Sequence, residues 1–125
     1  MTSPAHSVFE YLYRDAGNFK AWGELLLEGV LTDAEISRLT ARFDEGELFV
    51  AEQIGVPALY EELWRQCQCD PSDELDHVWH EFSEIRVATS EDLARLKPWG
   101  AATALLASVE KVDAWDLTRS PNWEL

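Results

Sequence analysis

The turn-forming segment Asp15-Ala16-Gly17-Asn18 constrains the fold most strongly, because it separates two apolar segments near the N-terminus. Residues 8–14 carry aromatic side chains at alternate positions, a pattern typical of a strand with one buried face. Residues 19–28 indicate a second strand, broken or bulged near Gly23. Gly and Asn tolerate positive φ, and Asp hydrogen-bonds nearby backbone amides. We therefore predict that the chain begins with a β-hairpin.

The segment 31–46 predicts the clearest helix. Thr32 stands at an N-cap position with Glu35 three residues later, which is a capping box. Leu31 and Ile36 occupy the two positions of a hydrophobic staple around this cap. Gly46 is a typical helix terminator.

The remaining segments complete one α+β arrangement. In chain order they predict a strand at 47–54 and a helix that starts near Pro57 and carries Leu59, Leu63 and Trp64 inward. A loop at 66–75 and a strand at 76–88 follow, and then a short helix capped by residues 89–92 and ended by Pro98. The chain ends with a helix at 101–112 and a tail whose Trp115 and Trp123 pack back on the body. The order β-β-α-β-α-β-α predicts a mainly antiparallel sheet of about four strands with two to three helices on one face. Residues 1–125 are expected to form a single domain.

The composition predicts a folded, soluble protein. Hydrophobic residues make up 46% of the chain, and six Trp residues offer large side chains for a core or an interface. No segment approaches the roughly 18 apolar residues of a membrane span. The N-terminal residues lack the basic and apolar regions of a signal peptide, so we expect a cytoplasmic protein.

The two cysteines, Cys67 and Cys69, are separated by one residue. Such close neighbours rarely form a disulfide, and two ligands do not make a zinc site. We expect two reduced thiols near a helix end and no cofactor.

Negative charge is concentrated in the middle of the chain. There are 24 acidic and 10 basic residues, giving a formal net charge of −14. Between Phe43 and Ile85 lie twelve acidic residues, and Arg65 is the only base. Nucleic acids and anionic lipids need a basic face, so these partners are not expected. A basic protein partner or a cation is favoured instead.

Residues 76–82 (DHVWHEF) hold the densest group of titratable side chains. His77, His80 and Glu81 suggest metal binding or acid–base catalysis, with His77 and His80 as candidate metal ligands. On a strand the two histidines point to opposite faces, because side chains alternate. The competing interpretation is a histidine that is hydrogen-bonded for structural reasons beside a carboxylate.

Two further carboxylates are weaker catalytic candidates. Glu52 interrupts an apolar segment and, if buried, needs a basic partner such as Arg14. Asp15 forms a polar pair with Arg14 that belongs either to the hairpin turn or to a binding corner. The sequence contains no nucleophile elbow, P-loop or dinucleotide-binding glycine motif.

Three stretches of the chain, YRDAGNFKAWGELLLEG, GELFVAEQIGVPALYEELW and DHVWHEF, resemble a group of small, acidic bacterial proteins without an assigned activity. The likeness covers roughly residues 9–88. It implies a bacterial, single-domain, stand-alone protein and supplies no functional residues.

These observations favour a binding module over an enzyme. A compact acidic protein can cap a basic surface, as immunity-type proteins and inhibitors that imitate nucleic acid do, because fixed carboxylates steer cationic partners. We expect the partner-binding residues to be Asp70, Asp73, Glu74 and Asp76. The alternatives are a small metal-dependent or acid–base enzyme that uses His77, His80 and Glu81, and a homodimer that buries several Trp residues.

Overall fold

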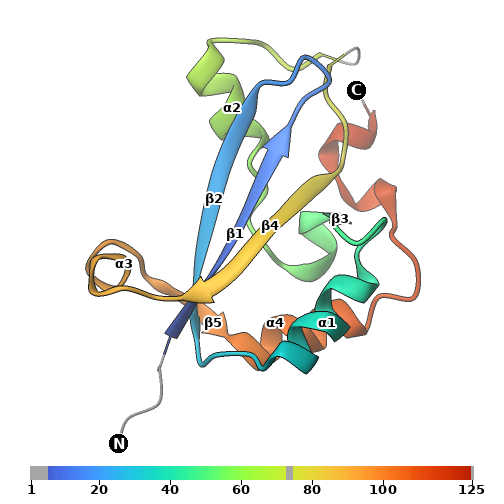
Figure 1. Cartoon of the computed structure of the whole chain (residues 1–125). Coiled ribbons are helices and arrows are strands. Elements are labelled where there is room, and N and C mark those ends of the chain that lie inside the picture. The colour runs from blue at the N-terminus through green and yellow to red at the C-terminus, as the bar shows by residue number, and fades with distance from the viewer. Residues whose placement is uncertain (1–5, 73–74, 125) are drawn as a thin grey trace, which may run out of the picture.

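The fold is built around the predicted hairpin, in which β1 (His6–Arg14) pairs with β2 (Lys20–Glu28) (Figure 1). The structure is a computed structural model, and it describes residues 6–72 and 75–124. In the turn, the Asp15 N–H donates to the Phe19 carbonyl (3.0 Å), and Asn18 adopts a positive φ of 68°. The hairpin prediction is confirmed.

The expected bulge near Gly23 is absent, because the β1–β2 register runs through it without a shift. Gly23 lies opposite Tyr11, and a Cβ placed on Gly23 would meet the Tyr11 ring at 2.7 Å. The glycine is therefore explained by the close approach of an aromatic ring to the strand.

The strands form one mixed sheet in the order β3-β4-β1-β2-β5. β3 (Leu48–Phe49) and β4 (His80–Val87) extend the hairpin on one side through antiparallel pairing. On the other side, β5 (Pro98–Ala101) pairs parallel to β2. The α+β class is confirmed, with five strands in the part of the chain that the structure describes, where about four were expected. The additional strand, β5, has only four residues and includes Pro98 and Gly100, so its pattern did not predict a strand.

In residues 6–72 and 75–124, three helices cover the core face of the sheet and a fourth lies apart, where two to three were expected. α1 (Asp33–Arg42), α2 (Tyr60–Cys67) and α4 (Ala102–Glu110) bury their apolar residues against this face. α3 (Ser90–Arg95) stands away from them (Figure 1). It is attached to the outward face of the sheet by ion pairs, so the helices do not all lie on one face. Three short 3₁₀ helices, Ala51–Ile54, Leu117–Arg119 and Pro121–Glu124, complete the structure.

Two capping boxes fix helix starts. Thr32 and Glu35 exchange the predicted hydrogen bonds before α1, and Thr89 and Asp92 do the same before α3. α1 ends earlier than predicted, at Arg42. Gly46, expected to terminate this helix, instead has a φ of 80° in the turn that leads into β3.

Three element boundaries differ from the prediction for identifiable reasons. The strand expected at 47–54 stops at Phe49, because Ala51 and Ile54 are both buried on one side of a 3₁₀ helix. The second helix begins at Tyr60, because the Leu59 N–H donates to Nε2 of the His80 ring. The strand expected from residue 76 begins at His80, because the preceding residues are held by side-chain hydrogen bonds.

The C-terminal segment returns to the core through Trp115. Its indole N–H donates to the Arg42 carbonyl (3.0 Å), and its ring packs against Phe43. Trp123 remains 54% exposed. No helix among the described residues is long and apolar enough to cross a membrane.

Candidate partner-binding surface

His80 lies inside the core. Its side chain is fully buried among aromatic rings, with Tyr13 and Tyr60 closest (5.4 and 5.0 Å between ring centroids). Nε2 accepts a hydrogen bond from the Leu59 N–H (2.9 Å), and Nδ1 has no hydrogen-bond partner within the described ranges. Burial, reinforced by nearby His77, lowers the pKa of His80 to about 3. The ring is therefore neutral at physiological pH and closed to substrate.

His77 is fixed by backbone groups on both ring nitrogens. Nδ1 accepts from the Trp79 N–H (3.0 Å), and this leaves Nε2 to donate to the Arg14 carbonyl (2.6 Å). The ring thus ties the start of β4 to the end of β1, and it has no free nitrogen for a metal ion. The structural interpretation of both histidines is the one that these contacts favour.

The other catalytic candidates have separate structural contacts. Glu81 pairs with Arg14 (2.9 Å) on the outward face of the sheet. Glu52 accepts a long hydrogen bond from the Tyr60 hydroxyl (3.4 Å), and burial raises the pKa of this carboxyl group. Asp15 accepts from the Phe19 N–H (3.0 Å) and so caps the hairpin turn. Across the described residues, no three His, Cys, Asp or Glu side chains are placed to hold one metal ion.

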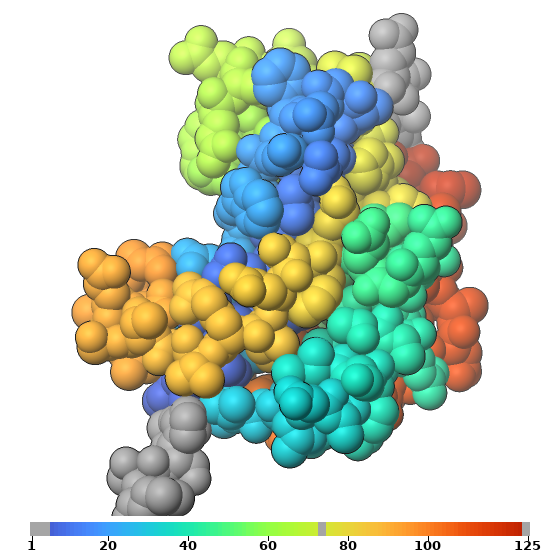
Figure 2. Space-filling view, in the orientation of Figure 1, coloured from blue at the N-terminus to red at the C-terminus, as the bar shows by residue number. Residues whose placement is uncertain are grey.

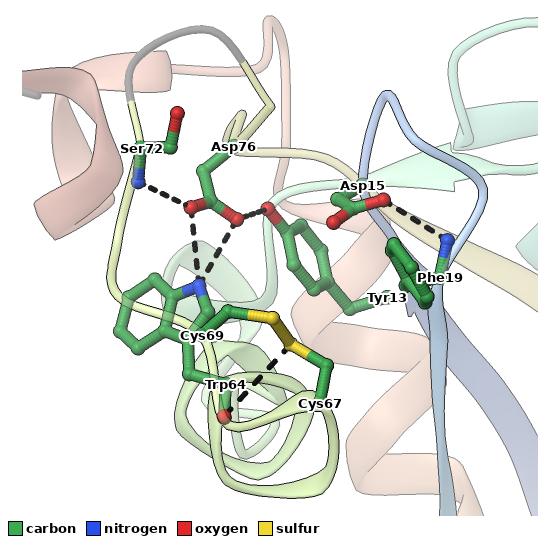
Figure 3. Close-up of a disulfide and its surroundings, with 8 residues drawn as sticks. All are labelled: Tyr13, Asp15, Phe19, Trp64, Cys67, Cys69, Ser72 and Asp76. Carbon is green, nitrogen blue, oxygen red and sulfur yellow. Dashed lines mark hydrogen bonds between the residues drawn. A yellow bond between two sulfur atoms is a disulfide. The ribbon is translucent and has the colours of Figure 1, made fainter.

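The loop between α2 and β4 is anchored by Asp76 (Figure 3). Its carboxylate accepts hydrogen bonds from the Tyr13 hydroxyl (2.5 Å), the Trp64 indole N–H (3.1 Å) and the Ser72 N–H (2.8 Å). Asp70 is exposed, whereas Asp73 and Glu74 lie outside the described residues. Of the four predicted partner-binding acids, Asp76 is thus committed to internal contacts.

Cys67 and Cys69 are joined by a disulfide beside this loop (Figure 3). Gln68 between them has a φ of 56°, which turns the chain at the end of α2. The two Cα atoms are 5.3 Å apart, within the usual range for a disulfide of about 4.4–6.8 Å. The expectation of two reduced thiols is therefore wrong for this structure.

The outward face of the sheet carries a closed network of ion pairs. Arg86 on β4 contacts Glu10 on β1 (2.5 Å), Glu24 on β2 (3.2 Å) and Asp92 on α3 (2.6 Å). Arg95 adds contacts to Glu24 and Asp92. The hydrogen bond from Arg86, supported by those from Thr89, holds the pKa of the Asp92 carboxyl well below its usual range. These three acids are neutralised within the protein and offer little attraction to a partner.

A second group of acids has no such neutralisation. It consists of Asp44, Glu45 and Glu47, in the turn between α1 and β3, and Glu84 on β4; we call this group the acidic edge. All four residues are exposed, and no ion pair or side-chain hydrogen bond with another described residue engages their carboxylates. Arg42, the nearest base in sequence, donates instead to the Val112 carbonyl (3.0 Å).

The fold brings the acidic edge together from two parts of the chain. The Phe82 N–H donates to the Glu47 carbonyl (2.7 Å), and Leu48 pairs with Glu81. Glu84 follows two residues after Phe82. In Figure 2, the green turn after α1 and the yellow-gold surface of β4 adjoin on one face.

Sequence reasoning included these four residues among the twelve central acids but did not select them. Local sequence cannot show which carboxylates meet an arginine from a distant strand. A weak indication was available, because residues 44–47 include three acids without an adjacent Lys or Arg in the turn itself.

No protein-family model, curated protein or solved structure matches this chain. Any functional interpretation therefore rests on the contacts and charges of this molecule.

Proposed function

We propose that this chain is a protein-binding module whose acidic edge caps a basic surface of a partner protein. The observation that supports it is the uneven neutralisation of charge. Glu10, Glu24 and Asp92 are paired with Arg86 or Arg95, whereas the acids of the acidic edge face solvent unpaired. Exposed carboxylates without an internal cation leave a negative potential at this surface, which attracts a cationic partner.

The same contacts weigh against the enzyme alternative. Both ring nitrogens of His77 contact backbone groups, His80 is buried in its neutral form, and Glu81 is paired with Arg14. A candidate acid or base needs access to the proton it transfers. No observation on the described residues favours a metal-dependent or acid–base reaction over binding.

The test is co-purification of tagged protein with partners from its host, using two charge-reversal variants. The edge variant carries Asp44→Lys, Glu45→Lys and Glu47→Lys. The comparison variant carries Asp70→Lys, Asp73→Lys and Glu74→Lys, which reverses the same number of charges at the surface predicted from sequence. Circular dichroism first establishes that both variants fold.

We expect the parent and the comparison variant to retain one basic partner at low salt and release it at high salt, because screening weakens exposed charge pairs. The edge variant should lose at least about tenfold in affinity, chiefly through slower association. Retention of the partner by the edge variant, or retention unaffected by salt, would contradict the proposal.

A further inference from the structure

Beyond residue 82, the edge of β4 is open. β3 covers only His80 and Glu81 through strand pairing, and the Glu47 carbonyl takes the Phe82 N–H. Among the described residues, no strand pairs with residues 83–87 on the side away from β1. A bare strand edge is a template for another extended chain, because its backbone groups remain available for pairing.

The register identifies which backbone groups face this edge. The Ala88 N–H donates to the His6 carbonyl, so this pair is hydrogen-bonded across the β1–β4 ladder. Bonded and non-bonded pairs alternate in an antiparallel ladder. Ile85 (opposite Phe9) and Val87 (opposite Ser7) therefore direct their N–H and C=O groups away from β1, toward the open edge. The Val87 C=O already accepts a long hydrogen bond from the Arg86 guanidinium (3.5 Å), so the groups offered to another chain are the N–H and C=O of Ile85 and the N–H of Val87.

An apolar groove lies directly beside these backbone groups. It has a volume of about 240 Å³, and its lining includes Ile85 and Val87 from β4 together with Val30, Leu31 and Ile36 from the start of α1 and the residues before it. Val30 is 41% exposed and Val87 is 51% exposed. Small-molecule pockets usually measure roughly 300–1,000 Å³, so this groove suits one or two side chains rather than a larger ligand.

The charges around the groove select the occupant. Asp33 lines it, and Glu84 lies on the adjoining stretch of β4, with no ion pair to either carboxylate within the described residues. Arg86, the one base in the lining, is occupied by Glu10, Glu24 and Asp92. The surroundings therefore complement an apolar side chain flanked by positive charges.

We propose that an extended basic segment of the partner protein adds as a strand to the open edge of β4, over residues 83–87. Its backbone bonds the N–H and C=O groups of Ile85 and the N–H of Val87, as in other cases of strand addition. One apolar side chain enters the groove, and the neighbouring lysines or arginines face Glu84 and Asp33. This assignment rests on the proposed acidic binding function and names the segment that the acidic edge attracts.

The test uses defined peptides and ¹⁵N-labelled full-length protein. The probe is acetyl-Lys-Val-Lys-Val-Lys-Val-Lys-amide. The control, acetyl-Lys-Val-Lys-Pro-Lys-Val-Lys-amide, has the same charge but lacks a central backbone N–H. Val87→Lys adds a charge inside the groove, and Leu93→Lys adds the same charge on α3 at a similarly exposed position (47%). NMR titration gives affinities, and hydrogen exchange reports the amides.

We expect the probe to bind and to slow exchange at the Ile85 and Val87 amides. The proline control and the Val87→Lys variant should each bind at least about tenfold more weakly, while Leu93→Lys binds like the parent. Equal binding of both peptides, or no probe binding at millimolar concentration, would overturn strand addition. If the partner still depends on Asp44, Glu45 and Glu47 in co-purification, the acidic binding function survives that result. If co-purification does not depend on these three residues either, the proposed acidic binding function is wrong.

Discussion

At the scale of single residues, surroundings decide what His80 does. Sequence placed it beside a carboxylate and a second histidine, which is a common context for chemistry. In the folded chain it is an acceptor for the Leu59 N–H within an aromatic core. The fold requires the neutral form of His80, so the stability of the folded state depends on pH through this residue.

The lowered pKa of His80 predicts acid sensitivity. An unfolded histidine has a pKa near 6.5, whereas the folded value is about 3. Between these values the unfolded state binds the extra proton, so stability is complete above pH 6.5 and decreases as the pH falls below it. We expect the free energy of unfolding to fall by about 2 kcal/mol between pH 7 and pH 5 through this residue.

Urea titrations at both pH values check this expectation. Glu52 acts in the opposite direction, because burial raises the pKa of its carboxyl group. The informative comparison is therefore between the parent and His80→Gln, whose amide oxygen can still accept the Leu59 N–H. The variant should lose most of the pH dependence, while His6→Gln should keep it. If the free energy of unfolding changed with pH as much in His80→Gln as in the parent, His80 would be excluded as the source of the pH dependence.

At the scale of elements, the loop after α2 depends on one carboxylate. Asp76→Ala removes the acceptor for the Tyr13 hydroxyl, the Trp64 indole and the Ser72 N–H. We expect a loss of about 2–3 kcal/mol in the free energy of unfolding, because polar groups are left without their acceptor. Asp70→Ala, at an exposed position of the same loop, should change it by less than about 0.5 kcal/mol. Similar denaturation midpoints for the two variants would show that Asp76 does not anchor the loop.

Elements fixed by neighbours in sequence were the ones that could be predicted. The hairpin turn at Asp15 and the capping boxes at Thr32 and Thr89 depend on residues within four positions of each other. β5 and the end of β3 depend instead on pairing with distant strands. The late start of β4 likewise depends on the contact of His77 with Arg14, 63 residues away in the chain. Local patterns carry no information about such contacts.

At the scale of the whole molecule, the total charge was evident from the sequence but its distribution was not. The central excess of acids predicted a cationic partner. The fold then separates these acids into internal acceptors such as Asp76, paired groups such as Glu81, and the unpaired acidic edge. This separation moves the proposed surface from the α2–β4 loop to the edge formed by the α1–β3 turn and β4.

Zero-length cross-linking of the chain to its captured partner tests this surface most directly. A carbodiimide joins a carboxylate to a lysine only where the two are in contact, and mass spectrometry identifies the joined residues. We expect cross-links to concentrate at Asp44, Glu45, Glu47 and Glu84 and to disappear when the complex is formed at high salt. Cross-links concentrated at Asp70, Asp73 and Glu74, or spread evenly over the exposed acids, would contradict binding at the acidic edge.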